Sequence, residues 1–131
     1  MSEIQVIRSD KEPQYYRYPG IGWRPAINTE TAQVGEIHMG SGATGGWHHH
    51  GKRTLYGYVV SGKSMIEYGV KGEKHVVLSA GDFFMVPAGL PHRDVNPNKE
   101  EAVIMIFNIG PGPASFDLPA RRICDRTSSC E

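Results

Sequence analysis

The chain has 131 residues, with 14 acidic and 14 basic side chains and a formal charge of zero. This length fits one domain with a single buried core. The balanced charge does not favour a general nucleic-acid binder, which usually carries a basic excess. Residues 1–13 lack the apolar segment of a secretory signal, and no apolar run is long enough to cross a membrane. We therefore expect a cytoplasmic protein with neither a nucleic-acid nor a membrane partner.

Sixteen glycines and nine prolines divide the sequence into short segments rich in Val, Ile, Tyr, Phe and Met. This pattern is typical of an all-β sandwich or barrel. In chain order, strands are expected at residues 4–8, 33–39, 56–60, 64–70, 73–78, 82–86 and 102–109. Ser61-Gly62-Lys63 predicts a tight hairpin between two of them, because glycine accepts the positive φ of such turns. A helix is considered near residues 119–124.

The histidines carry the chemical signal. In Trp47-His48-His49-His50, side chains two residues apart on a strand share a face, so His48 and His50 converge while His49 points away. Two imidazoles held this way suit a divalent first-row metal. His92 is the natural third ligand, because the Pro- and Gly-rich segment before it makes a rigid turn. His38 and His75 are expected to be surface or core residues.

Two motifs spanning residues 42–96 resemble those of the cupin superfamily. The first, G-x5-H-x-H-x3,4-E-x6-G, maps to Gly42, His48, His50 and Gly62, with Leu55 in place of the glutamate. The second, G-x5-P-x-G-x2-H-x3-N, matches at every fixed position: Gly81, Pro87, Gly89, His92 and Asn96.

The resemblance implies a double-stranded β-helix, the jelly-roll barrel of cupins, with one divalent metal on His48, His50 and His92. It divides the chain into an N-terminal strand and arm (1–30), a barrel core (31–110) and a C-terminal tail (111–131). It also implies a homodimer, in which the strand expected at residues 4–8 is exchanged between sheet edges.

Leu55 cannot coordinate a metal, so three neutral imidazoles would leave the site with the full charge of its ion. Such a site should attract an anionic, chelating molecule. If Leu55 lines the pocket, alternation also places Gly57 there, where its missing side chain leaves space for a substrate. Trp23, Trp47, Tyr15, Tyr16 and Tyr18 either line the pocket entrance or pack across a sheet.

Cupins with three-histidine sites include dioxygenases that use non-haem iron(II), so the resemblance favours an Fe(II) dioxygenase. The alternatives are an isomerase, lyase or dehydratase that uses Zn, Ni, Mn or Cu, and a non-catalytic barrel that binds a small molecule. No catalytic residue can be named from the sequence. Cys124 and Cys130 are either ordinary thiols or a disulfide that closes a short loop.

Overall fold

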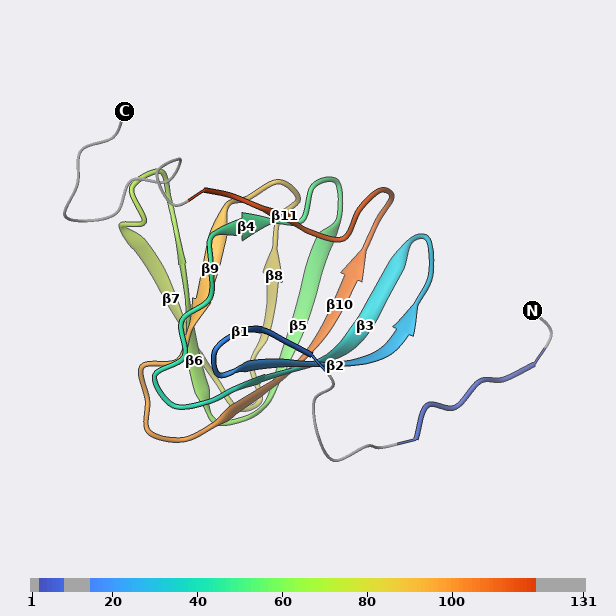
Figure 1. The fold of residues 1–131 in the computed structure, drawn as a ribbon, viewed down its shortest axis with the longest axis horizontal. Helices are drawn as coiled ribbons and strands as arrows, with labels where there is room; N and C mark the ends of the chain where they lie inside the picture. The colour runs from blue at the N-terminus through green and yellow to red at the C-terminus, as the bar shows by residue number, and fades with distance from the viewer. Residues whose placement is uncertain (1–2, 9–14, 120–131) are drawn as a thin grey trace.

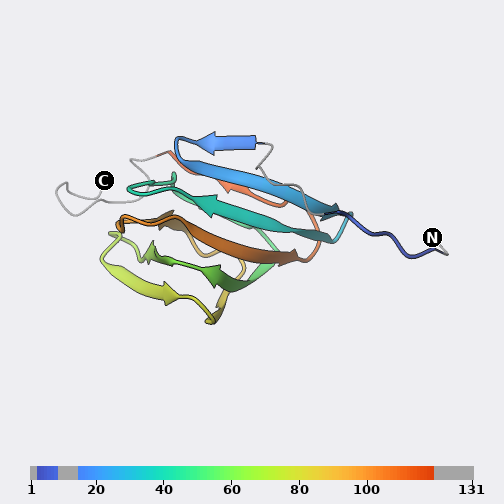
Figure 2. The ribbon, with the colours of Figure 1, turned by 90° about the horizontal axis from the view of Figure 1, so that it is seen from below.

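The computed structural model describes residues 3–8 and 15–119, and in these residues every regular element is a strand. Two antiparallel sheets face each other as a jelly-roll barrel (Figures 1 and 2), which confirms the all-β prediction. The strands are β1 (Tyr15–Tyr18), β2 (Ile21–Asn28), β3 (Ala32–Met39), β4 (His48–His49), β5 (Thr54–Ser61), β6 (Lys63–Tyr68), β7 (Lys74–Ser79), β8 (Phe83–Val86), β9 (His92–Val95), β10 (Ala102–Ile109) and β11 (Phe116–Asp117).

The larger sheet has the order β1-β2-β3-β10-β5-β8, and the smaller sheet has the order β11-β4-β9-β6-β7. β5 and β6 therefore belong to different sheets, and the hairpin predicted at Ser61-Gly62-Lys63 is instead a corner between the sheets. Gly62 has a φ of 75°, and a Cβ there would lie 2.3 Å from the carbonyl oxygen of Glu101. Glycine was correctly placed at a turn, but its local sequence does not reveal which strands the turn joins.

Six of the seven expected strands are present, with ends within two residues of the prediction. The seventh prediction is wrong, because residues 4–8 form no strand. The side chains of Ile4, Val6 and Ile7 are 94%, 58% and 50% exposed. The exchange of this segment between subunits, and the homodimer itself, stay predictions.

Strands β1, β2, β9 and β11 were missed, and for β2 the reason is a proline. β2 contains Pro25, which argues against a strand because proline cannot donate a backbone hydrogen bond. Among the described residues, β1 pairs with β2 only as far as Trp23, so no described residue pairs with Pro25 on that side. The register between β2 and β3 also shifts between Pro25 and Ile27. The proline is thus accommodated at an edge irregularity.

Buried apolar residues pack between the two sheets. The cluster consists of Met39, Leu55, Val59, Ile66, Leu78, Val86, Ala102, Ile104 and Ile106. In the described part of the chain, no helix is long and apolar enough to cross a bilayer. Of the segment expected as a C-terminal tail, residues 111–119 are described, and they include β11, which pairs with β4. Cys124, Cys130 and residues 120–124 of the helix considered there lie outside the described residues.

Candidate metal centre and its cavity

The structure brings His48, His50 and His92 together. β4 pairs antiparallel with β9 so that His48 lies directly opposite His92, and His50 follows two residues after His48. One ring nitrogen from each of the three lies within 4.8 Å of those of the other two. All three residues are at least 92% buried, with exposed fractions of 8%, 7% and 1%.

Main-chain carbonyls orient the three rings. The Nδ1 atoms of His48 and His92 lie 2.9 Å and 2.8 Å from the carbonyl oxygens of Gly46 and Leu90, each two residues earlier. Because a carbonyl can only accept, each of these Nδ1 atoms carries the proton and donates it. The Nε2 atoms are then left with free lone pairs that face the cluster.

His50 is fixed in the same way by a more distant partner. Its Nδ1 donates to the carbonyl oxygen of Ala114 at 3.0 Å, and its buried Nε2 has no hydrogen-bond partner in the described structure. An unpaired nitrogen buried beside two others is costly unless something binds it. Three converging imidazole nitrogens with carbonyl-bonded second nitrogens fit a divalent first-row metal ion.

Burial also sets the charge of these rings. Desolvation lowers the pKa of His50 to about 4, and burial likewise holds the pKa of His92 below its ordinary value. Both rings are therefore neutral at neutral pH, the form in which imidazole binds a metal.

Asp94 is a site residue that the sequence analysis missed. It follows His92 by two residues on β9, so both side chains face the cavity. The Oδ2 of Asp94 lies 4.0 Å from the Nε2 of His48. The alternation that paired His48 with His50 would have found it, had it been applied after His92.

Leu55 lies where the cupin motif has glutamate, and it lines the cavity as predicted, 5% exposed. The expected absence of a carboxylate from the site nevertheless needs correction. Asp94 supplies one from a different strand, and a carboxylate beside a divalent ion lowers the charge that a substrate meets. Asp94 is also a group that could exchange protons with a substrate.

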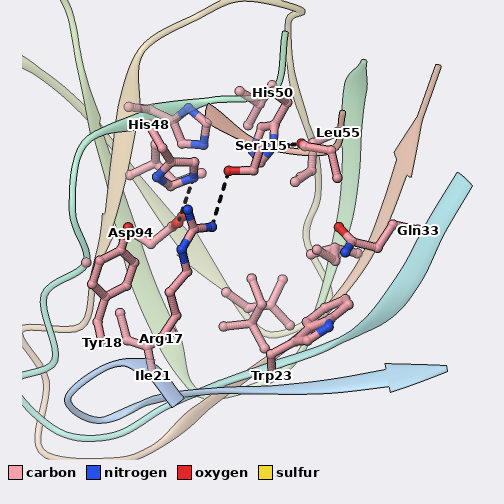
Figure 3. Close-up of a pocket in the computed structure, with 18 of the residues that line it drawn as sticks. Arg17, Tyr18, Ile21, Trp23, Gln33, His48, His50, Leu55, Asp94 and Ser115 are labelled. Carbon is pink, nitrogen blue, oxygen red and sulfur yellow. Dashed lines mark hydrogen bonds and ion pairs between the residues drawn. The ribbon is translucent and has the colours of Figure 1, made fainter. Parts of the chain in front are cut away.

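The histidines lie at the end of a cavity of about 520 Å³ between the sheets. Figure 3 shows His48, Asp94 and Arg17 on one side of this space, His50 beside Ser115 and Leu55 at its top, and Trp23 at its bottom. Most of the remaining wall is apolar and consists of Ile21, Trp23, Ile37, Leu55, Ile66, Phe84, Val86, Ile104 and Ile106. Gln33 adds a side-chain amide to this part of the wall.

Three polar contacts join β1 to residues 115–117 beside the histidines. Arg17 of β1 donates to the Oγ of Ser115 at 3.2 Å (Figure 3). It also forms an ion pair with Asp117 of β11. The hydroxyl of Tyr18 donates to the same carboxylate at 3.3 Å. The hydrogen bond from Arg17 holds the pKa of Asp117 below its usual range. Since Arg17, Tyr18 and Ser115 line the cavity, these contacts are part of its wall.

Gly57 makes room, but in a different way from the one predicted. A Cβ on Gly57 would lie 2.2 Å from Cζ of Phe84, so the ring of Phe84 occupies the space left by the glycine. Gly35 relates similarly to Trp23, whose Cη2 would lie 2.5 Å from an added Cβ. Phe84 and Trp23 both line the cavity, whereas Gly57 is covered by Phe84. The two glycines therefore enlarge the cavity by seating aromatic rings in its wall.

The other histidines lie outside this site. His49 stacks on Phe116 with ring centroids 5.0 Å apart. His38 bonds to Glu36 at 3.0 Å, and His75 is exposed on β7. The aromatic residues were expected either to line the pocket entrance or to pack across a sheet. Tyr15, Tyr16, Tyr18 and Trp23 line the cavity, whereas the ring of Trp47 packs under Arg93.

The family model of the Cupin domain matches residues 35–109. The chain is a cupin. This match covers both histidine motifs and the strands that carry them.

Similar proteins extend the comparison. A curated relative, oxalate oxidase GF-3.8 of Triticum aestivum, is 28% identical over 102 residues, which are 72% of this chain and 45% of the relative. The chain thus spans about half the length of that relative. A solved Klebsiella pneumoniae protein with a double-stranded β-helix domain is 17% identical with a TM-score of 0.73, covering 89% of this cupin and 99% of that chain. KdgF from Halomonas sp. is 28% identical with a TM-score of 0.60, covering 72% of this cupin and 84% of that chain.

Proposed function

We propose that this cupin is a metal-dependent enzyme that acts on a small anionic molecule, with Fe(II) held by His48, His50 and His92 and dioxygen as the oxidant. The observation that carries the proposal is the set of three buried rings whose Nδ1 atoms are engaged by carbonyls, so that their Nε2 atoms converge. A bound ferrous ion would supply electrons and a Lewis-acidic position for the oxygen atoms of a substrate.

The surrounding residues contribute binding and proton transfer. The guanidinium of Arg17, which is paired with Asp117, lies in the cavity wall beside the histidines and can donate hydrogen bonds to an anionic group of a substrate. Asp94, on the same wall, can take a proton from the substrate or return one to it. The apolar walls exclude bulk water from that exchange. The likeness to a wheat protein named for the oxidation of oxalate supports an oxidative reaction on an acid.

Lewis-acid chemistry is the second candidate, and Asp94 is the observation that favours it. An isomerase, lyase or dehydratase needs a group that moves a proton beside a polarised carbonyl, and a carboxylate 4.0 Å from a ligand nitrogen is placed to do this. Zn, Ni, Mn or Cu would serve this chemistry at the same three histidines.

The test compares the protein loaded with Fe(II) under anaerobic conditions and the protein loaded with Zn(II). Bound metal is measured by elemental analysis, and oxygen consumption is then measured with a panel of small acids, thiols and diketones. Stoichiometric iron with substrate-dependent oxygen consumption supports the oxidative reaction. Turnover with zinc and without oxygen consumption favours Lewis-acid chemistry. Failure to hold any of these metals overturns the proposal.

The role of Asp94 is tested with Asp94→Asn, which keeps the size of the side chain and removes its basicity. Metal content should be retained, while turnover should fall by about 10²–10⁴-fold, the usual contribution of a positioned acid or base. Asp82→Asn makes the same change at an exposed turn, where the side chain accepts a bond from the amide of Ser79, and turnover should not change.

A further inference from the structure

The cavity behind the histidines has properties that a small dicarboxylate does not require. Its volume of about 520 Å³ lies within the range of about 300–1,000 Å³ that is usual for pockets enclosing drug-sized ligands. Oxalate, with two carbon atoms and four oxygen atoms, would fill a small part of it. The apolar walls would then face water instead of ligand, which gives up the free energy of their burial.

Most polar groups of the cavity surround the histidines, and the amide of Gln33 lies across the space from Arg17 and Asp94 (Figure 3). His48, His50, His92 and Asp94 come from β4, β9 and the residue after β4, and Arg17 and Ser115 lie beside them. A ligand with oxygen atoms all around it would place some of them against the apolar side chains of Ile37, Ile104 and Ile106, which offer no hydrogen bond.

The apolar end is built around two aromatic rings. Trp23 of β2 lies over Gly35 of β3, and Phe84 of β8 lies over Gly57 of β5. All four residues belong to the larger sheet. Each ring occupies space where an ordinary side chain of the neighbouring strand would stand, so it is set back into the wall. Aromatic side chains recognise other rings through edge and stacked contacts in addition to their apolar area.

We propose that the substrate is a monocarboxylic acid with an aromatic or similarly bulky apolar body. Its acid group faces the three histidines, Arg17 and Asp94, and its body fills the chamber between Trp23 and Phe84. The placement of the acid group at the histidines rests on the proposed function. The apolar body of the substrate is inferred from the apolar chamber alone.

The test is isothermal titration calorimetry of the Zn(II)-loaded protein with phenylacetate, acetate and oxalate. Zinc is used because it cannot turn over an oxidative substrate. Phenylacetate should bind more than about tenfold more tightly than either other acid, since loss of a buried apolar group typically costs at least this factor. Affinity for oxalate or acetate equal to or above that for phenylacetate overturns the inference.

Two variants test the chamber itself. Gly57→Ala pushes the ring of Phe84 into the cavity and should weaken phenylacetate binding about tenfold, with acetate binding and zinc content unchanged. Phe84→Leu removes the ring and should shift the preference from phenylacetate toward the larger 1-naphthylacetate, which keeps the test decisive if Gly57→Ala does not fold. Phe83→Leu is the matched control, because Phe83 is 82% exposed and does not line the cavity. Unchanged selectivity in the Phe84 variant contradicts the inference.

The two proposals fail in different ways. A protein that takes up stoichiometric zinc but prefers oxalate overturns the aromatic acid and leaves the metal site standing. A protein that takes up no metal overturns the proposed function, and the ratio of phenylacetate to acetate affinity in the metal-free protein then decides the inference about the body.

Discussion

The two ends of the cavity are positioned by different means. At the histidine end, His48 and His92 each bond to the carbonyl two residues earlier, so short stretches of chain orient their own rings. At the apolar end, the rings of Trp23 and Phe84 are placed by glycines on neighbouring strands. His50 is intermediate, because its carbonyl partner, Ala114, is 64 residues away. Local positioning should make the histidine end tolerant of change elsewhere, whereas the apolar end depends on the pairing of whole strands.

The sharpest test of the histidine end is His92→Ala. Loss of one of three ligands should lower metal affinity by more than about 100-fold, above the usual 10–100-fold cost of removing a residue that only supports a ligand. The barrel should remain folded, since its core is apolar. Elemental analysis after dialysis and far-UV circular dichroism measure the two effects. His49→Ala is the control, because His49 stacks on Phe116 outside the cluster. Stoichiometric metal in the His92 variant would show that the ligand set is wrong.

The stability of the metal-free protein should depend on pH through His50. Burial lowers its folded-state pKa to about 4, from an ordinary value of 6.5. Between these values the unfolded chain binds the proton more tightly, so stability is present above pH 6.5 and is lost as the pH falls toward 4. The shift corresponds to roughly 3 kcal/mol. The burial of His92 acts in the same direction.

Urea unfolding in the presence of a chelator, at pH 7 and pH 4.5, measures this dependence. His50→Gln removes the titrating group, so its stability should fall less between the two pH values than that of the unaltered protein. An equal fall in both proteins would contradict the assignment of the effect to His50.

Asn108 tests the support that His50 receives from Ala114, a residue distant in the sequence. Its side-chain amide donates to the carbonyl oxygen of Ala114 at 2.9 Å, and the same oxygen accepts from His50. Asn108→Ala should free that carbonyl and lower metal affinity by about tenfold, as expected for a positioning residue outside the ligand set. A chelator competition titration measures the change.

Asn96 provides a matched control for Asn108. Both asparagines are almost fully buried, 0% and 1% exposed, but the amide of Asn96 donates to Met39, Gly40 and Glu100. Asn96→Ala should therefore reduce the free energy of unfolding, while the metal affinity of the folded protein should not change. If both variants lower metal affinity equally, the effect of Asn108 is general destabilisation and not positioning.

The same contrast explains what could be predicted from the sequence. Fixed spacings on short segments identified His48, His50 and His92, because strand alternation and one rigid turn are local properties. Asp94 could have been predicted from the same alternation, because it lies two residues after His92 on β9, but the pattern was not extended beyond His92. The seating of Phe84 over Gly57 depends on the pairing of β5 with β8, which places Gly57 opposite Phe84. That register is a tertiary property and cannot be predicted from the local sequence. Gly57 was therefore predicted to leave free space for a substrate, whereas it makes room for the ring of Phe84.

Similar reasoning applies to the fold. The alternating segments that became β3, β5, β6, β7, β8 and β10 were found, because each carries its own apolar pattern. β2 was missed because Pro25 argues against a strand unless its place beyond the described end of β1 is known. Residues 4–8 have an apolar content typical of a strand, yet no strand pairs with them in the described structure. A pattern of side chains indicates which segments can form strands, whereas the partners decide which ones do.

The smallest effect is expected for the ion pair between Arg17 in β1 and Asp117 in β11, which lies at the cavity wall. Asp117→Asn should lower the free energy of unfolding by less than about 1 kcal/mol, because the side chains are 46% and 63% exposed and solvent screens the pair. The pKa of Asp117 is lowered by Arg17, so even this contribution should vanish as the pH falls through the folded-state value. Urea unfolding of Asp117→Asn, Arg17→Ala and the double variant measures the coupling. A coupling well above 1 kcal/mol would mean that this contact helps to hold the two sheets together. The histidine end would then depend on a contact between distant segments as much as the apolar end does.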